Sequence, residues 1–553
     1  MAQRRILILS FCLLLGYIAS LAGSRTEREM LAIAQRQLQG AGSMTRSAND
    51  AEIRKLSEDT FYAIYGSEKG GFAVISRDDS FEPVLGYSAT TFSKDAMPCG
   101  LQWWLNAINE SMESRSFTTQ RAVTRADYTP VAALCKTVWG QGDPYNYLTP
   151  ELKGQHTPTG CVATAMSQIM KYFSYPAKGK GKGYYTTSEN PTRVTETINS
   201  VYQWEKMQDT YSGSSLTDDI RMPVATLMKD AGLATNMTYG TNGSGALSVI
   251  AARGFAYNFS YDSLAIHCYY RDYFNETDWM NTIYSELSAG RPILYTGVDP
   301  GAGGHAFVFD GIDADGKIHV NWGWDGTGNG FYDIADLNPT DERGKPGNNH
   351  FNKQQSMLYG FKCQENPDPD EHYTSLWCSQ TPYELSLNGK ILEVKSGSVY
   401  NYNFLYFYGV FGVFFDNQDG NHEQDAFLQL KKADKIGVAT FFGYDNLDNT
   451  VFISDVPEGH YRLYLASKAV NENNYQPVRC PGGVQYYDID ISAAGITMSE
   501  AKILGPSTPT GITTVTDKAR MDDAIYTLQG QKVQDLPSNR GIYIQGGKKI
   551  VRK

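Results

Sequence analysis

The sequence has few cysteines, and their spacing excludes the metal sites that cysteines usually form together. Eight cysteines are spread over 553 residues, a density far below that of a disulfide-based scaffold. They form no C-x-x-C pair and no paired Cys/His spacing, so a structural zinc site is not expected. Cys12 lies in the first apolar segment. The remaining cysteines are odd in number, which in an exported protein is consistent with a free, reactive thiol.

The chain also lacks an excess of positive charge and, after its first residues, any long apolar run. It has 49 basic and 60 acidic residues, a formal net charge of -11, so it has no broad basic face and no nucleic-acid partner is expected. No later stretch is long and apolar enough to cross a membrane. The composition is otherwise that of a globular protein, and the length predicts several folding units.

Residues 1–23 are typical of a secretory signal peptide. Arg4 and Arg5 precede an apolar stretch from Ile6 to Ile18, and residues 20–22 (Ser-Leu-Ala) offer a small-x-small cleavage pattern. An N-terminal membrane anchor is the alternative, but the apolar stretch is short for a span. We therefore expect a secreted protein, extracellular or on the cell surface.

Residues 24–125 have the pattern of a small α/β unit that ends in a polar linker. Helical spacing of apolar residues occurs at 25–38 and 99–112, and strand-like runs occur at 61–65, 72–76 and 84–87. The linker is rich in Ser and Thr and contains Arg121 and Arg125. Exposed linkers of this kind are where proteolysis concentrates.

Three further regions follow this unit. Residues 126–364 mix predicted helices with two adjacent strands joined at Asp315-Gly316; the helices are 161–173, 224–230 and 277–287, and the strands are 305–310 and 317–322. Residues 372–505 contain short strands rich in Tyr and Phe, such as 400–407 and 461–465, and are predicted to form a β-sandwich-like module. Residues 511–553, after a Pro/Thr/Gly linker, form a small unit with two short strands.

Cys161 is the first candidate for a reactive thiol. It follows Thr159-Gly160 and begins a predicted helix, whose unpaired N–H groups and partial positive charge favour a thiolate. The thiolate is the nucleophilic form of cysteine. A buried structural cysteine is the alternative for this segment taken alone.

His305 is the candidate base for that thiol. It follows two glycines that let another backbone come close, and imidazole suits general-base work near neutral pH. It lies about 140 residues after Cys161, within the range of ~130–150 for papain-like enzymes, although the local papain signature is absent. A hydrogen-bonded core histidine is the alternative.

Three more residues have the chemistry to support this pair. Asn321 and Trp322 end the next strand, where an amide oxygen would fix the imidazole tautomer and an indole would exclude water. Gln141 precedes the nucleophile, and its amide N–H with the backbone N–H of Cys161 would form an oxyanion hole.

The sequence shows no complete metal site. Two acidic loops, Asp313–Gly316 and Asp416–Gly420, lack the full ligand spacing of a calcium site. The expected reaction of a thiol and an imidazole needs no metal and no organic cofactor, and we expect neither.

In this order and spacing, the motifs resemble the streptopain family of cysteine peptidases, and especially its interpain and periodontain type. The matching segments are Trp139–Gln141, Gly160–Ala165, Gln168–Tyr172, Gly303–Val308 and Val320–Trp324. The similarity covers roughly residues 130–362 and extends more weakly into the N-terminal unit. It implies an α+β fold: a papain-like two-lobed catalytic domain with an N-terminal α/β propeptide and C-terminal β-rich modules.

The resemblance also implies a role for each matching residue. Cys161 would be the nucleophile, His305 the general base and acid, and Gln141 the oxyanion donor. Either Asn321 or Trp322 would orient His305. Ser244 and Gly304 would line a pocket for an apolar residue of the substrate.

The implied function is endopeptidase activity on protein and peptide substrates, with the propeptide as an intramolecular inhibitor. Two alternatives stay open at this point: a Cys-His acyl transferase of transglutaminase or amidase type, and a non-catalytic binding protein on a peptidase scaffold. Residues 525–533 and 540–544 resemble tails sorted through the bacterial outer membrane by type IX secretion. They imply that secretion machinery as a partner, unless the tail is a small β-module without an address function.

Overall fold

A computed structural model describes the chain in segments: residues 23–40, 52–67, 70–79, 81–115, 128–211, 216–299, 303–334, 355–364, 376–378, 383–395, 398–437, 441–443, 450–470 and 472–504, with four short strands between 525 and 552. Residues 1–22 of the expected signal peptide and the linker residues Arg121 and Arg125 lie outside this part. Among the helices of the described segments, none has the length and apolar character needed to span a membrane.

The helices lie in two regions, an N-terminal unit (residues 23–115) and a central region (residues 128–364). They are α2 (Glu27–Gly40), α3 (Cys99–Arg115), α4 (Cys161–Phe173), α5 (Asp218–Ala234), α6 (Ser248–Tyr257) and α7 (Glu276–Ser288). Every helix expected from apolar spacing is present, and α4 begins and ends as predicted. The helix α6 was not predicted.

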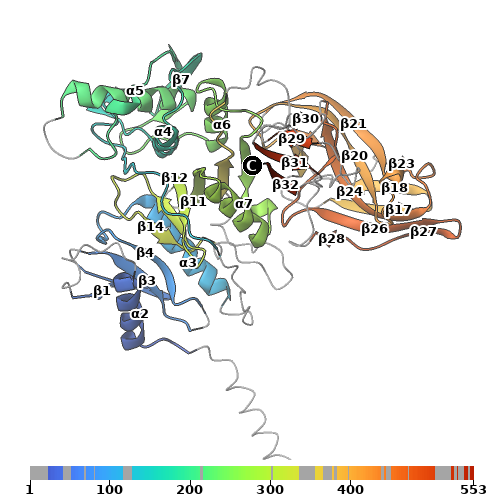
Figure 1. The fold of residues 1–553 in the computed structure, drawn as a ribbon, viewed down its shortest axis with the longest axis horizontal. Coiled ribbons are helices and arrows are strands. Elements are labelled where there is room, and N and C mark those ends of the chain that lie inside the picture. The colour runs from blue at the N-terminus through green and yellow to red at the C-terminus, as the bar shows by residue number, and fades with distance from the viewer. Residues whose placement is uncertain are drawn as a thin grey trace, which may run out of the picture.

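One antiparallel sheet of ten strands runs through both regions (Figure 1). Its strands, in spatial order, are β1 (Arg54–Glu58), β2 (Tyr62–Gly66), β3 (Phe72–Ser76), β4 (Val84–Ser88), β14 (Gly330–Tyr332), β13 (Ile318–Asn321), β12 (Gly303–Ile312), β11 (Ile293–Asp299), β15 (Ser356–Tyr359) and β10 (His267–Tyr270). The join is the pair β4–β14, where Ser88 lies opposite Gly330. The N-terminal unit therefore extends the sheet of the central region.

The two faces of this sheet are covered by different helices, because successive side chains of a strand point to opposite faces. Leu294 of β11 and Val308 of β12 share a buried cluster with α4. Their neighbours Tyr295 and Phe307 share a second cluster with α3 and α7. Residues of α4 and α3 therefore approach β12 from opposite faces.

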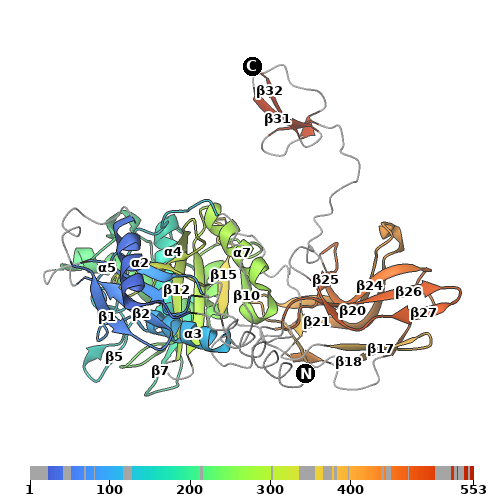
Figure 2. The same ribbon diagram turned by 90° about the horizontal axis from the view of Figure 1, so that it is seen from below.

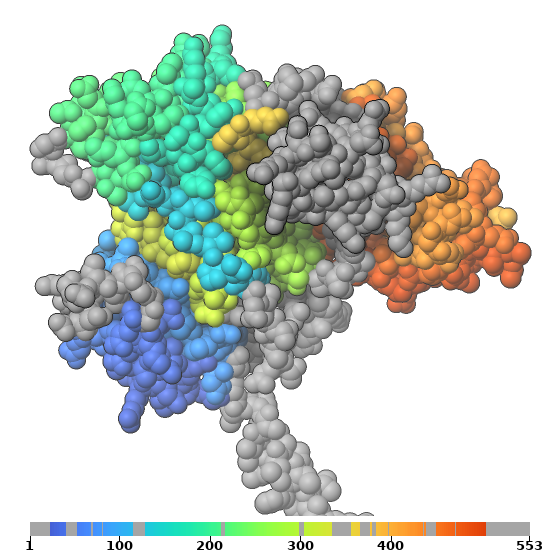
Figure 3. All heavy atoms as spheres, viewed as in Figure 1, coloured from blue at the N-terminus to red at the C-terminus, as the bar shows by residue number. Residues whose placement is uncertain are grey.

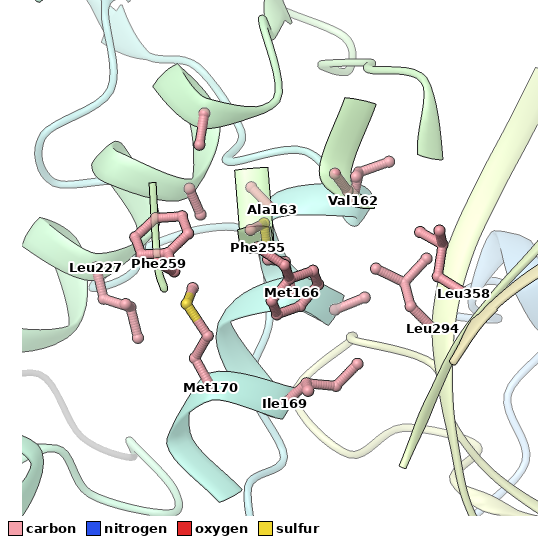
Figure 4. Close-up of a cluster of buried hydrophobic side chains, with 14 of the residues drawn as sticks. Val162, Ala163, Met166, Ile169, Met170, Leu227, Phe255, Phe259, Leu294 and Leu358 are labelled. Carbon is pink, nitrogen blue, oxygen red and sulfur yellow. The ribbon is translucent and has the colours of Figure 1, made fainter. Parts of the chain in front are cut away.

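The helix α4 is buried over most of its length. Residues 162–170 are all buried, and Figure 4 shows Met170 beside Leu227 and Phe259, with Leu294 and Leu358 on the sheet side. Small sheets flank this helical part: β5 (Glu151–Leu152) with β6 (Gln155–His156), and β8 (Val194–Thr197) with β7 (Lys182–Thr187) and β9 (Thr238–Tyr239). The burial fixes α4, and so the position of its first residue.

Residues 376–504 form a β-module with its own core (Figures 1 and 2). Its strands are β16 (Trp377–Cys378), β17 (Glu384–Asn388), β18 (Ile391–Lys395), β19 (Ser398–Tyr400), β20 (Phe407–Asn417), β21 (Ala426–Ile436), β22 (Phe441–Gly443), β23 (Thr450–Phe452), β24 (Gly459–Ala469), β25 (Gln476–Pro477), β26 (Gln485–Ser492), β27 (Gly495–Met498) and β28 (Lys502–Ile503). A seven-stranded sheet packs with two three-stranded sheets.

The prediction of a strand over residues 400–407 is wrong. The strand β19 ends at Tyr400 and β20 begins at Phe407. Between them the side-chain amide of Asn401 donates to the carbonyl oxygens of Leu405, at 2.6 Å, and Ile436, at 3.0 Å. These bonds close a turn, and they place Leu405 in the buried cluster around α4.

The C-terminal unit has more strands than the two expected. Its described residues form a four-stranded sheet of β29 (Ile525–Thr527), β30 (Lys532–Val533), β31 (Gly541–Gln545) and β32 (Lys548–Arg552). The second hairpin, β31–β32, contains the basic Lys548 and Lys549.

Candidate active site

Cys161 is the first residue of α4, and Gly160 makes its position possible. Gly160 has φ of 88°, in the left-handed region that favours glycine. A Cβ on Gly160 would lie 2.7 Å from the thioether of Met237 and 3.0 Å from the carbonyl oxygen of Ser244. The chain can therefore turn into α4 here only with glycine, and this turn presents the Cys161 thiol.

The surroundings of Cys161 act on its thiol in opposite directions. Burial raises its pKa above the ordinary value, while the backbone amides of Ala306, Val162 and Cys161 itself lower it. Burial has the larger effect, so the thiol is protonated in this structure. The same amides are the donors that would stabilise a thiolate or an oxyanion once charge develops.

His305 lies on β12, next to Ala306. Its side chain is 7% exposed, and burial lowers the pKa of its imidazole to about 4, partly offset by the backbone carbonyl of Trp322. The imidazole is therefore neutral near pH 7. The backbone amide of Ala306, the next residue of β12, contacts the Cys161 thiol, so the predicted nucleophile touches the strand beside the predicted base.

The ring of His305 is in contact with a different cysteine. The Sγ of Cys99, the first residue of α3, lies 3.1 Å from Nδ1 and 3.5 Å from Nε2 of His305. Burial raises the pKa of Cys99 to about 12, with the Cys161 thiol adding to the rise. The contact is thus between a neutral thiol and a neutral imidazole. Within the described residues, no hydrogen bond joins His305 to Cys161.

The start of α3 is packed directly on the imidazole. A Cβ on Gly100 would lie 2.7 Å from Cδ2 of His305 and 2.4 Å from Cε3 of Trp322. The indole of Trp324, 38% exposed, also lies near this ring, with its ring centroid 6.4 Å from that of His305. The N-terminal unit therefore occupies the space beside the base.

The other predicted residues divide into those near Cys161 and one that faces elsewhere. The carbonyl oxygen of Gln141 accepts from the N–H of Thr159 at 3.1 Å, two residues before Cys161. The Ser244 hydroxyl donates to the carbonyl of Pro158 at 2.7 Å. Gly304 is exposed beside His305. Gln141 and Ser244 are therefore bonded to the segment that precedes Cys161, and Gly304 precedes His305 on β12.

Asn321 and Trp322 occupy different surroundings. Trp322 is fully buried, donates its indole N–H to the carbonyl of Gly328 at 3.0 Å, and lies beside His305. The Asn321 amide faces away from the imidazole, and donates to the carbonyl of Thr137 at 2.7 Å and to Gln168 at 3.0 Å. Of these two residues, Trp322 is the one that contributes to the surroundings of the imidazole ring, through its backbone carbonyl.

Two site residues received no role from the sequence, Cys99 and Gln168. Cys99 has the signal that singled out Cys161, a cysteine at the first position of a predicted helix. Gln168 lies in a matched motif of α4, but a buried amide has no signature in sequence. Its partners are defined only in three dimensions.

One group of side chains outside this site has the composition of a metal site. Among the described residues, ligand atoms of Asp416, His422 and Asp425 lie within 4.8 Å of one another. The loop is closed by its own hydrogen bonds, since the Asn417 side chain accepts from the N–H groups of Asp419 and Asn421. It belongs to the β-module and contributes nothing to the chemistry at Cys161.

Two protein-family models match the chain. The model described as the Peptidase C10 family matches residues 139–332, which contain the predicted site residues. The model described as Spi protease inhibitor matches residues 23–112, which contain Cys99. The contact between Cys99 and His305 therefore joins an inhibitor-like unit to a peptidase-like one.

Three similar proteins extend this result. Streptopain of Streptococcus pyogenes is 35% identical over 345 residues, which cover 57% of this chain and 86% of streptopain. The thiol protease/hemagglutinin PrtT of Porphyromonas gingivalis is 29% identical over 402 residues, covering 68% of this chain and 46% of PrtT. The solved structure of a fragment of Prevotella intermedia prointerpain A, a cysteine-to-alanine mutant, is 35% identical with a TM-score of 0.51, covering 57% of this chain and 100% of that one.

Proposed function

The chain belongs to the streptopain family of cysteine peptidases, and from this premise we propose how its residues hydrolyse peptide bonds and how they are held inactive. It is a cysteine-type endopeptidase with an inhibitory propeptide. In our proposal Cys161 is the nucleophile, His305 the general base and acid, and Gln141 the oxyanion donor. One observation supports this most directly: the Cys161 thiol, at the start of α4, contacts the amide of Ala306 beside His305.

The proposed reaction has two halves. In the first, His305 takes the thiol proton and the sulfur adds to the peptide carbonyl, whose oxygen becomes an anion held by the Gln141 amide and a backbone N–H at Cys161. The imidazolium then protonates the departing amine, which leaves a thioester. In the second, His305 takes a proton from water, the hydroxide attacks the thioester, and the acid product leaves as the thiol is restored.

Latency follows from the contact with Cys99. While α3 packs on His305, the imidazole faces the propeptide thiol instead of Cys161, and burial keeps both groups neutral. Removal of the propeptide, by cleavage in the linker with Arg121 and Arg125, would expose the ring and free it to pair with Cys161. Cysteine and imidazole would then form the reactive pair.

For the substrate, we propose a two-lobed papain-like cleft in which Ser244 and Gly304 contact an apolar residue two positions before the cut. The Ser244 loop is held against the turn before Cys161, since its backbone oxygen faces Gly160 and its hydroxyl binds Pro158. Gly304 lies on the opposite wall of this proposed cleft, and because it has no side chain it leaves that wall open. Both positions adjoin the nucleophile and the base.

For export, we propose that residues 1–23 direct secretion and that residues 511–553 act as an outer-membrane sorting tail. The four-stranded sheet β29–β32 is compatible with a compact, separately recognised unit. Deletion of residues 511–553 should retain the protein inside the outer membrane, as measured by cell fractionation. Normal release of the shortened protein would contradict a sorting role.

Peptidase activity is tested by casein hydrolysis with the reduced full chain, with and without a thiol alkylator, followed by mass mapping of the alkylated peptide. We expect cleavage that disappears as Cys161 is modified. The Cys161→Ala chain should stay as stable, unprocessed precursor. Processing of this variant with no other peptidase present would contradict autocatalytic activation, and cleavage that survives modification of Cys161 would contradict its role.

A further inference from the structure

Gln168 is a fully buried amide on the helix that carries the nucleophile. It lies on α4 seven residues after Cys161, about two helical turns along the same face, and its side chain is 0% exposed. Buried polar groups are costly unless their hydrogen bonds are satisfied. An amide buried at this place therefore needs partners from the segments around it.

The Oε1 atom of Gln168 accepts three hydrogen bonds from two different segments. They come from the hydroxyl of Thr137 at 3.0 Å, the backbone N–H of Trp139 at 3.1 Å and the side-chain amide of Asn321 at 3.0 Å. In return, Nε2 of Gln168 donates to Oδ1 of Asn321 at 3.3 Å. Thr137 and Asn321 are buried as well.

Backbone groups fix which end of each amide is oxygen. The N–H of Trp139 can only donate, so it must face Oε1 of Gln168. Asn321 donates through Nδ2 to the carbonyl of Thr137 at 2.7 Å and accepts through Oδ1 from the N–H of Gly323 at 3.2 Å. Neither amide can flip without setting two donors or two acceptors against each other.

These bonds connect the segments that carry the proposed catalytic groups. Trp139 comes two residues before Gln141, the proposed oxyanion donor. Asn321 and Gly323 lie on both sides of Trp322, whose carbonyl lies beside His305. The helix of Gln168 begins with Cys161. One buried amide thus links nucleophile, oxyanion donor and the support of the base.

We propose that Gln168, paired with Asn321, is a positioning residue for the peptidase reaction. It touches neither substrate nor reacting atoms, and acts through Gln141 and Trp322. This inference rests on the proposed function. In this proposal, Asn321 supports the helix that begins with Cys161 and the segment at residues 137–139. Displacements of about 1 Å in such groups can lower rates about 100-fold, so the effect should appear in kcat.

The test uses Gln168→Met in the full chain, which keeps the length of the side chain and removes its hydrogen bonds. Tyr202→Phe is the matched control, because it removes a buried hydroxyl that donates to Asp230 at 2.9 Å in the same region. All precursors are activated by a trace of mature wild-type enzyme. Active sites are then counted by titration with a thiol alkylator, and kcat and KM are measured on a peptide substrate.

We expect Gln168→Met to lower kcat about 10- to 100-fold with KM changed less than about threefold, while Tyr202→Phe leaves both unchanged. In a Gln141→Ala background, Gln168→Met should lower kcat much less, because Gln168 acts in part through the Gln141 side chain that this background lacks. Gln168→Glu keeps the acceptor oxygen and should fall between the wild type and Gln168→Met.

A kcat within twofold of wild type for titrated Gln168→Met, or full additivity with Gln141→Ala, overturns the proposal. If Gln168→Met fails to fold, Gln168→Glu decides by the same criteria. A wild-type chain that folds and matures without cleaving peptide would contradict the proposed function itself, which is a separate result.

Discussion

At the scale of residues, two cysteines at helix starts lie near one imidazole. Cys161 and Cys99 each begin a buried helix, α4 and α3, and the helices approach β12 from opposite faces of the sheet. Side chains alternate along the strand, and His305 shares the face of Phe307, toward α3. Cys99 is thus the thiol in contact with His305, although Cys161 is the proposed nucleophile.

Cys99→Ala should speed autocatalytic activation. The substitution removes the thiol at 3.1 Å from His305. Loss of such a buried contact destabilises the inhibited precursor by about 1–2 kcal/mol, which corresponds to a roughly 5- to 30-fold faster conversion. Cys99→Ser keeps a donor at this place and should activate at nearly the wild-type rate. The conversion of precursor to mature enzyme is followed on gels over time. Equal rates for Cys99→Ala and the wild type would show that the contact does not restrain His305.

His305 should make the precursor less stable in acid. The pKa of the His305 imidazole is about 4 in the folded chain, and its ordinary value is 6.5. At pH values between about 4 and 6.5, the unfolded chain therefore binds a proton that the folded chain does not. The free energy of unfolding therefore falls as pH drops from about 6.5 through about 4, by up to ~3 kcal/mol.

Urea unfolding of the Cys161→Ala chain at several pH values measures this loss, and Cys161→Ala with His305→Gln is the control. The His305→Gln chain should lose less stability over the same window. Parallel pH profiles for the two chains would assign the acid sensitivity to other groups.

At the scale of elements, the propeptide is held by strand pairing and by one helix. The strand β4 adds to β14 at the edge of the central sheet, and the hydroxyl of Tyr87 donates to Asp313 across this join at 3.1 Å. In α3, the indole of Trp104 donates to the carbonyl of Asp333 at 2.7 Å. The first turn of α3 is thereby held against His305.

Gly100→Ala should loosen this turn, because its Cβ would clash with the rings of Trp322 and His305 at 2.4 and 2.7 Å. Overpacking of this kind costs about 1–3 kcal/mol, so we expect a precursor that activates faster and that releases its propeptide more easily. Gly142→Ala is the matched control, since its Cβ would meet no atom within 4 Å. Activation rates that are the same in both variants would contradict tight packing of α3.

At the scale of the whole molecule, the β-module is docked on the central region through buried aromatic rings. The Trp377 ring centroid lies 4.8 Å from that of Tyr273, whose hydroxyl donates to the carbonyl of Cys378 at 2.7 Å. The guanidinium of Arg479 lies 4.0 Å from the ring centroid of Phe274 and donates to the carbonyl of Tyr273 at 3.1 Å. Figure 3 shows the module (orange) beside the central region (green).

Trp377→Ala should uncouple the two parts. Trp377 is 5% exposed, and loss of a buried Trp costs about 3–5 kcal/mol. Calorimetry of the Cys161→Ala chain should show the module and the central region melting together, and two separated transitions once Trp377 is replaced. Phe452→Ala, at a side chain 68% exposed, should leave the melting profile unchanged. Separate transitions already present in the parent chain would contradict a structural docking.

The sequence by itself determined the features that depend on neighbouring residues. A cysteine after Gly160 at a helix start, and a histidine that opens a strand after two glycines, indicated Cys161 and His305, because helix starts and strand alternation are local patterns. The tertiary structure alone decided which groups meet. The contact of Cys99 with His305 and the bonds of Gln168 to Trp139 and Asn321 depend on how distant strands pair and helices pack, and no local pattern encodes those distances.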